Sequence, residues 1–252
     1  MLSVDALSHS FDGRPVLKNI NFNVRRGDFY AIMGPNGCGK TTLLRCMAGL
    51  LTPDSGSVSV NGNPVGLISP RRLAQQMAYV QQQLAPDFDF TAEEVVLMAR
   101  TPYQRPLQSD SPDDHAIVQQ SMLLTSTWHL RGQRLSQMSG GERQRVLIAR
   151  ALAQQTPVLL LDEPLSNLDI AHQFAILELL RRLNQQESKT ILLVIHHIEL
   201  AYEYCPSLLL LHDGAVAFSG PMSQGLSPES VCRVFGVDAD IYNNHIVLSS
   251  RS

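Results

Sequence analysis

The chain has 252 residues, which suits one large domain or two small ones. Hydrophobic residues make up 44% and charged residues 17%, so a sizeable core can form and extensive disorder is excluded. The formal net charge of −3 argues against a dedicated nucleic-acid-binding protein, because such proteins carry a clear basic excess.

Cysteine usage and apolar runs indicate a cytoplasmic protein without membrane spans. The four cysteines contain no Cys-x-x-Cys pair, and we expect them to be reduced thiols. The first residues lack the basic-then-apolar pattern of a signal peptide. Runs such as Ile191–Ile195 are far shorter than the roughly 18 residues that a spanning helix needs. We therefore expect a soluble chain whose membrane role, if any, comes through a partner.

The first third of the chain is typical of strands and turns. In Val16–Val24, apolar residues alternate with polar ones, which predicts a half-buried strand. Asp28–Met33 is a short apolar strand, and Thr41–Leu50 has the spacing of a helix. The strand Ser57–Val60 runs into Asn61-Gly62, a dipeptide typical of a tight hairpin turn.

The middle of the chain, from about Pro86 to Ser136, changes to a helical pattern. Thr91 and Glu94 form a predicted capping box at the start of one helix. The stretch Pro102–Asp114 is rich in Pro, Ser and Asp, and we expect it to be a loop before another helix.

Beyond Ser139, helices and strands alternate. The expected elements are a helix Glu142–Gln154, a strand Val158–Leu161, a helix Ile170–Gln186, a strand Thr190–Ile195, a short helix and a strand Leu208–Leu211. Such alternation indicates βαβ units and a parallel sheet with helices on both faces. An Asp213-Gly214 turn then precedes a last strand, and the segment from Ser227 onward predicts a short helix and a small hairpin.

The residues Gly34 to Thr41 match the pattern G-x-x-x-x-G-K-[ST] between an expected strand and an expected helix. Glycines let the backbone amides point at phosphate oxygens, and the helix start adds a favourable dipole. Lys40 would reach the β- and γ-phosphates and Thr41 would offer its hydroxyl to Mg²⁺. The loop therefore predicts a nucleoside triphosphate site, with Cys38 as a small filler. Its expected nucleotide-binding residues are Gly34, Pro35, Asn36, Gly37, Cys38, Gly39, Lys40, Thr41 and Thr42.

Two further motifs follow the phosphate loop. A second glycine pair, in Ser139-Gly140-Gly141-Glu142, opens a helix and could bind an anion, although by itself it fits an ordinary helix cap better. A buried-strand pattern then ends in Asp162-Glu163. An Asp in this place can hold Mg²⁺ and the next carboxylate can deprotonate a water molecule. The alternative is a surface acidic pair, which the phosphate loop upstream disfavours.

In this order along essentially the whole chain, the motifs resemble those of the ABC-family ATPases, with Ser139-Gly-Gly-Glu-Arg143 similar to the family's signature loop. The resemblance implies an α/β fold: a P-loop NTPase (RecA-like) core with an antiparallel β subdomain and a helical insertion. The implied division is residues 1–85 and 140–226 for the catalytic core with the β subdomain, 86–139 for the helical subdomain and 227–252 for a C-terminal extension.

The resemblance also implies roles for single residues. Phe11 would stack on adenine, Gln82 would contact Mg²⁺ and respond to a membrane partner, and His196 would contact the γ-phosphate. The implied catalytic residues are thus Glu163, His196 and Gln82, and the implied metal-binding residues are Thr41, Gln82 and Asp162. Ser166-Asn-Leu-Asp169 resembles the family's D-loop, in which Asp169 would organise the facing subunit's site. The chain departs from the family at Met138, usually Leu, and at His197, usually Asp, and the glutamine run leaves Gln81 as an alternative to Gln82.

The family resemblance further implies a head-to-tail homodimer that hydrolyses ATP to ADP and phosphate with Mg²⁺. Each ATP would lie between one phosphate loop and the other chain's signature residues, which are Ser139, Gly140, Gly141 and Glu142. Nucleotide would close the dimer and hydrolysis would open it.

Two uses of that motion remain open: a transporter motor or a soluble ABC ATPase. A single phosphate loop and signature argue against tandem translation factors, and the lack of a long heptad insertion argues against the DNA-repair type. As a transporter motor, the chain would lie at the cytoplasmic face of the inner membrane. It would bind two copies of an integral membrane permease, indirectly serve a substrate-binding protein, and bind no nucleic acid.

One segment of the sequence indicates the class of cargo that such a transporter would carry. Phe90–Tyr103 resembles a segment of motors for iron–siderophore, haem and cobalamin uptake, although Ala99 stands where those often have Gly. A metal-chelate importer is the favoured hypothesis. A manganese/zinc importer motor and an exporter motor are the alternatives.

Overall fold

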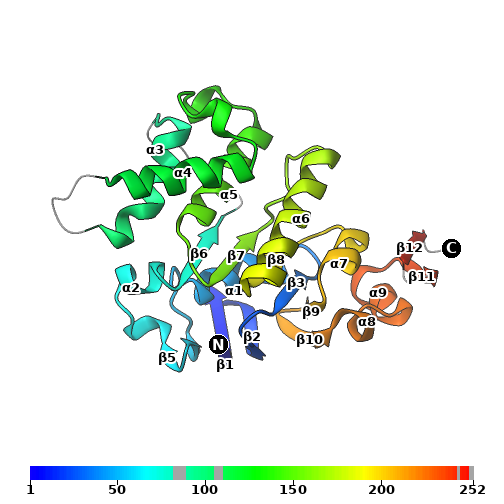
Figure 1. The fold of residues 1–252 in the computed structure, drawn as a ribbon. Helices are drawn as coiled ribbons and strands as arrows, with labels where there is room; N and C mark the ends of the chain where they lie inside the picture. Colours follow the sequence, from blue (N-terminus) through cyan, green and yellow to red (C-terminus); the bar gives the residue numbers. More distant parts are fainter. Residues whose placement is uncertain (82–88, 105–109, 243–244, 250–252) are drawn as a thin grey trace. The chain divides into compact units, whose positions relative to one another are not determined.

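The structure is a computed structural model that describes residues 1–81, 89–104, 110–242 and 245–249 (Figure 1). The chain forms two compact units, Met1–Ile68 with Arg181–Ser252, and Ser69–Leu180. Each unit is considered by itself below.

The first unit contains an antiparallel sheet in the order β2-β1-β4-β5. Its strands are β1 (Leu2–Phe11), β2 (Arg14–Val24), β4 (Ser55–Val60) and β5 (Asn63–Pro64). The alternation predicted for β2 is confirmed, because Ile20, Phe22 and Val24 are buried while the residues between them are exposed. Asn61 and Gly62 join β4 to β5 with φ angles of 52° and 79°, as a two-residue hairpin turn requires.

The second sheet of this unit places three loops at one edge. Strands β9 (Ser207–His212), β3 (Phe29–Met33) and β8 (Thr190–Val194) are parallel neighbours with β3 in the centre, and β10 (Ala215–Pro221) pairs with β9 in the antiparallel sense. Since parallel strands end at the same edge, the chain segments that follow β3, β8 and β9 leave the sheet together.

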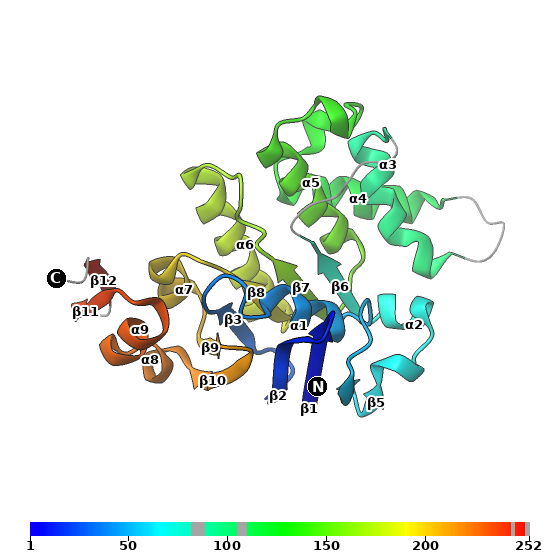
Figure 2. The same cartoon turned by 180° about the vertical axis from the view of Figure 1, so that it is seen from behind.

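Helices and a hairpin complete the first unit. They are α1 (Lys40–Met47), η1 (Val65–Leu67), α7 (Ile198–Tyr204), α8 (Met222–Gly225), α9 (Pro228–Phe235) and the hairpin β11 (Asp238–Tyr242) to β12 (His245–Ser249). The hairpin contacts α9 through β11 and α7 through β12, and both views show it beside them (Figure 2). The C-terminal helix and hairpin predicted from the sequence are therefore confirmed.

The second unit combines a parallel strand pair with a group of helices. The strands are β6 (Met77–Val80) and β7 (Val158–Asp162), and the helical elements are α2 (Pro70–Ala74), α3 (Ala92–Leu97), η2 (Met98–Tyr103), α4 (Pro112–Leu124), η3 (Trp128–Leu130), η4 (Leu135–Gln137) and α5 (Gly140–Ala153). Helices α3, α4 and α5 pack against one another. The last helix, α6 (Ile170–Glu187), begins in this unit and ends in the first.

Capping boxes define where these helices begin. The predicted box at Thr91 and Glu94 is confirmed, with Thr91 N–H donating to Glu94 Oε2 at 2.8 Å. The expected loop Pro102–Asp114 is wrong at both ends, because η2 extends to Tyr103 and α4 begins at Pro112. Ser111 caps α4 through the amide of Asp114, and a proline at the first helical position favours the start. Ser, Pro and Asp favour loops as well as helix starts, and here they begin a helix.

Among the residues that the structure describes, no helix is both long enough and apolar enough to cross a membrane. The four cysteines are free thiols, and three of them are buried: Cys38, Cys46 and Cys205.

Candidate nucleotide-binding site

The predicted phosphate loop lies between β3 and α1, as expected. Gly34 and Gly39 have φ angles of 148° and 102°, which side chains rarely adopt. A Cβ atom on Gly34 would lie 2.2 Å from the carbonyl oxygen of Leu211, and one on Gly39 would lie 2.6 Å from Leu17 Cδ2. The loop therefore turns where no larger residue fits, and it does so against β9 and β2.

Lys40 is 6% exposed and points back into its own loop. Its ammonium donates to the carbonyl oxygens of Gly34 at 2.8 Å and Pro35 at 2.9 Å. No side chain caps the amides at the start of α1. A cation and helix-start amides in one loop are the groups that bind phosphate.

Cys38 packs inside this loop, with Sγ 4.0 Å from Lys40 Nζ. Burial raises the pKa of its thiol above the ordinary value, although the nearby Lys40 charge opposes this. The thiol is thus neutral at physiological pH, which agrees with its expected role as a small filler. Asn36 and Gly37 are exposed, while Thr41 and Thr42 are partly exposed at the start of α1.

A hollow of about 310 Å³ adjoins the loop. It is lined by residues of β2, of the phosphate loop and of the turn after β9: Pro15, Val16, Lys18, Pro35, Asn36, Gly37, Cys38, Asp213 and Gly214. The backbone amide of Lys18 donates to the carbonyl oxygen of Gly214 at 2.7 Å, which ties the predicted Asp213-Gly214 turn to β2.

Three further residues that the sequence analysis named lie in the first unit. His196 follows β8 at the sheet edge where the phosphate loop follows β3, and its side chain is exposed. His197 is also exposed and is the cap residue of α7, so neither histidine belongs to the core. Phe11 ends β1 with 45% of its surface exposed, and its ring lies 4.7 Å from that of His9 at 84°.

The second unit carries the acidic pair. Asp162 ends β7 and is fully buried, and Tyr79 of β6 donates its hydroxyl to Asp162 Oδ2 at 3.2 Å. Glu163 follows with a φ of 50°, and its carbonyl oxygen accepts from the amide and hydroxyl of Ser166. The sequence analysis missed Tyr79 because it predicted the strand before Asp162 but not β6. Gln81 follows β6 at the edge where Asp162 ends β7; Gln82 lies outside the described residues.

The oxygen groups expected to bind Mg²⁺ suit that ion chemically. Mg²⁺ prefers a few protein oxygens together with substrate phosphates to a complete protein cage. The buried carboxylate of Asp162 and the hydroxyl of Thr41 are donors of this kind. Among the described residues there is no group of three His, Cys, Asp or Glu side chains that could hold a metal ion.

The signature loop forms a capping box at the start of α5. Ser139 Oγ accepts from the amide of Glu142, and Glu142 Oε2 accepts from the Ser139 hydroxyl at 2.7 Å and amide at 2.8 Å. These hydrogen bonds, the hydroxyl's foremost, lower the pKa of Glu142 below its ordinary value. A Cβ atom on Gly141 would lie 2.8 Å from the carbonyl oxygen of Asn167. The segment is thus a helix cap that also packs closely on the predicted D-loop.

The D-loop acid has a partner that the sequence analysis missed. Asp169 Oδ1 accepts from the backbone amide of His172 and lies 2.8 Å from His172 Nδ1. The amide bond first, and the ring second, lower the pKa of Asp169. The spacing of three residues at a helix start was the signal for this pair.

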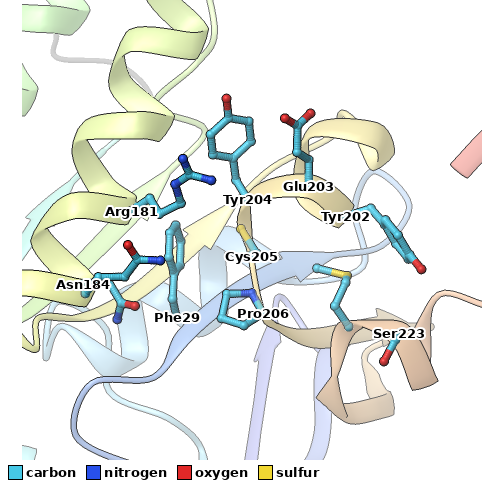
Figure 3. A pocket seen from close by; sticks show the side chains of 11 residues that line it. Phe29, Arg181, Asn184, Tyr202, Glu203, Tyr204, Cys205, Pro206 and Ser223 are labelled. Carbon is cyan, nitrogen blue, oxygen red and sulfur yellow. The ribbon is translucent and has the colours of Figure 1, made fainter. Parts of the chain in front are cut away.

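A second hollow, of about 550 Å³, lies at the amino ends of β3 and β9 (Figure 3). Arg181 approaches the ring of Tyr204 at 5.4 Å, and Asn184 donates to the carbonyl oxygens of Gly27 and Lys189. Phe29 begins β3 here, whereas the phosphate loop follows the other end of that strand. Of the predicted site residues that the structure describes, none lines this hollow.

Comparison with known proteins identifies the family. The family described as ABC transporter matches residues 17–166, which is more than half of the chain. The chain belongs to this ABC transporter family. The resemblance seen in the motifs is therefore confirmed.

Curated relatives in the family are import ATP-binding proteins. A cobalamin import ATP-binding protein of Halobacterium salinarum is 39% identical over 93% of this chain, but the chain spans only 58% of that protein's length. A petrobactin import ATP-binding protein of Bacillus anthracis is 35% identical over 96% of this chain and 89% of its own length. A hemin import ATP-binding protein of Nocardia farcinica is 37% identical over 97% of this chain and 84% of its own length.

Solved ABC structures share the fold. A metal-chelate type ABC transporter in an inward-facing conformation has a TM-score of 0.84 and 28% identity, covering 99% of this chain and 98% of that one. A dimeric ATP-binding cassette bound to ADP and phosphate has a TM-score of 0.79 and 29% identity. The match covers 88% of this chain and 99% of that one. The predicted fold class, a P-loop ABC ATPase with parallel and antiparallel sheets, is confirmed.

Proposed function

We propose that the chain is the ATP-hydrolysing motor subunit of a membrane importer for a metal chelate such as an iron–siderophore, haem or cobalamin. The observation that carries the proposal is the phosphate loop that holds Lys40, in a chain that matches import ATP-binding proteins over more than 90% of its length. The likeness to a metal-chelate type transporter supports the same cargo class.

The first unit supplies the groups for nucleotide binding. Lys40 and the loop amides bind the phosphates, Phe11 stacks on adenine, and His196 contacts the γ-phosphate. The residues assigned to phosphate binding in the loop are Gly34, Pro35, Asn36, Gly37, Cys38, Gly39, Lys40, Thr41 and Thr42. The ring of Phe11 keeps 45% of its surface exposed, and the imidazole of His196 is exposed as well.

The second unit supplies the groups for hydrolysis. Glu163 accepts a proton from the attacking water, whose oxygen bonds to the γ-phosphorus as the bond to the β-phosphate oxygen breaks. Thr41 of the first unit would hold Mg²⁺ together with Gln82 and Asp162, and the ion would neutralise charge on the phosphates. The buried state of Asp162 and its hydrogen bond from Tyr79 keep its carboxylate in one position.

The functional form is a head-to-tail homodimer in which each signature loop faces the nucleotide of the other chain. Ser139, Gly140, Gly141 and Glu142 then complete the partner's site. Two permease copies bind at the helical subdomain, residues 86–139, and a substrate-binding protein acts on the far side of the permease. The complex lies at the cytoplasmic face of the inner membrane and binds no nucleic acid.

The test is co-purification from native membranes solubilised in mild detergent, with the chain tagged and with Lys40→Ala as the matched control for nucleotide dependence. A polytopic membrane protein in stoichiometric amount, together with ATP turnover by the complex, is the expected result. Recovery only from the soluble fraction would contradict the transport proposal and favour a soluble ABC ATPase. Uptake of free manganese or zinc by the reconstituted complex, or export of cargo, would contradict the metal-chelate import proposal.

A further inference from the structure

His9 is a buried polar side chain that forms no hydrogen bond with any of the described residues. Its exposed fraction is 7%, and within the described part of the chain neither Nδ1 nor Nε2 meets the geometry of a hydrogen bond. Buried polar atoms in folded proteins almost always have a partner. An imidazole that gives up both hydrogen bonds is costly in a core position, so its presence calls for a role that an aliphatic residue would not fill.

The backbone around His9 is shaped to place this ring. The pairing of β1 with β2 is regular up to Val4, then shifts register on both sides of His9. Irregularities of this kind re-aim side chains, often beside functional sites. They leave Leu7 and His9 buried and Phe11 at the strand end, where its ring meets that of His9.

Asp54 fixes the segment from the other side. Its carboxylate Oδ2 accepts from the amide of Ser10 at 2.7 Å, and its own amide donates to the carbonyl oxygen of Ser8 at 2.9 Å. Its Oδ1 lies 3.4 Å from Nδ1 of His9, so a carboxylate faces the imidazole. The residues on both sides of His9 are therefore bonded to one aspartate, which holds the ring in place.

The ring of His9 packs against the ring of Phe11 and supports it. The two ring centres lie 4.7 Å apart and the planes meet at 84°, the edge-on arrangement that aromatic pairs prefer. Phe11 keeps 45% of its surface exposed. A ring supported from within and open to solvent is a prepared surface for stacking a flat ligand.

We propose that His9 is a positioning residue that orients Phe11 for the adenine ring of ATP. The inference rests on the proposed function, which puts adenine on Phe11. His9 contributes to recognition of the base and contributes nothing to recognition of the phosphates. Asp54 acts with it by fixing the strand around the imidazole.

The test measures the dissociation constants of ATP and of inorganic tripolyphosphate, both with Mg²⁺, by titration calorimetry on the full chain. The variants are His9→Ala, Phe11→Ala, the double variant, and His9→Phe, which keeps an aromatic ring. Val4→Ala is the control, because Val4 is a buried residue further back on the same strand. Circular dichroism checks that each variant is folded.

We expect His9→Ala to weaken ATP binding about three- to tenfold, the effect of one aromatic pair, and to leave tripolyphosphate binding unchanged. The double variant should bind ATP no worse than Phe11→Ala, since His9 acts through Phe11. His9→Phe should bind ATP within about twofold of the parent, which also supports the proposal if His9→Ala does not fold.

Three results would overturn the inference: unchanged ATP binding by His9→Ala, equal weakening of ATP and tripolyphosphate, or losses that multiply in the double variant. A parent chain that binds neither ATP nor tripolyphosphate would instead contradict the proposed function. The two failures are therefore distinguishable.

Discussion

The ammonium of Lys40 donates a hydrogen bond to the carbonyl oxygen of Gly34 at 2.8 Å, so the first and last parts of the phosphate loop are joined by the loop's own cation. The lysine is held in its loop by backbone oxygens. Because these bonds are to neutral carbonyls, anionic phosphate oxygens would be the stronger partners for the same ammonium.

Replacing Lys40 should therefore remove phosphate binding. Lys40→Ala loses one or more charge-assisted hydrogen bonds, each worth about 1.5–3 kcal/mol, so we expect ATP affinity to fall roughly tenfold to a hundredfold or more. Calorimetric titration with ATP measures the change. Lys189→Ala is the control, since Lys189 pairs with Glu187 at 3.9 Å, and it should bind ATP normally. Unchanged affinity in Lys40→Ala would contradict the nucleotide site.

Glu163→Gln should separate binding from chemistry. The amide cannot accept the proton of the attacking water, so turnover should fall by about 10²- to 10⁴-fold while ATP still binds. Phosphate release measures turnover, and light scattering should show an ATP-dependent dimer that persists. Glu187→Gln, an exposed carboxylate of α6, should hydrolyse normally. Near-normal turnover in Glu163→Gln would remove the residue from its assigned role.

The features that the sequence predicted well are local ones. The phosphate loop, the capping box at Thr91 and Glu94 and the turn at Asn61 are each specified by residues within a few positions of one another. In the same way, the alternation in β2 predicted which of its side chains are buried.

The features that were missed depend on which strands are neighbours. Tyr79 and Asp162 lie far apart in the chain and meet because β6 and β7 pair in parallel. Predicting that contact requires the order of the strands, which periodicity does not give. The helix start at Pro112 was missed for another reason, since Ser, Pro and Asp favour both loops and helix caps.

Gly141→Ala should disturb the contact between the signature loop and the D-loop. The new Cβ atom would come within 2.8 Å of the carbonyl oxygen of Asn167, so one of the two segments must move. We expect a stability loss of about 1–3 kcal/mol, as for other overpacked sites, and slower turnover with ATP binding retained. Urea unfolding and phosphate release measure the two effects. Gly132→Ala is the matched control, because its Cβ atom would meet nothing within 4 Å. Equal behaviour of the two variants would show that the close approach has no consequence.

The buried pair of Arg100 and Asp114 should make the second unit sensitive to acid. The two side chains are 6% and 7% exposed, and Arg100 Nε donates to Asp114 Oδ1 at 2.8 Å. That bond is the main cause that lowers the pKa of Asp114 below its ordinary value, with Ser111 adding to it. Because the folded pKa is lowered, the stabilisation is fully present above the unfolded value of about 4 and is lost as the pH falls through the folded value.

Asp114→Asn should therefore cost about 3 kcal/mol of unfolding free energy at pH 7, since it leaves the Arg100 charge buried without its partner. The difference from the parent should shrink as the pH is lowered below about 4, because the parent then loses the same interaction. Urea unfolding at pH 7 and at low pH measures both values. Asp89→Asn is the control, because the pair of Asp89 with Arg134 is about half exposed and should be worth less than about 1 kcal/mol. If Asp114→Asn lowered the unfolding free energy no more than Asp89→Asn does, burial of the Arg100–Asp114 pair would not make it more important for stability than an exposed pair.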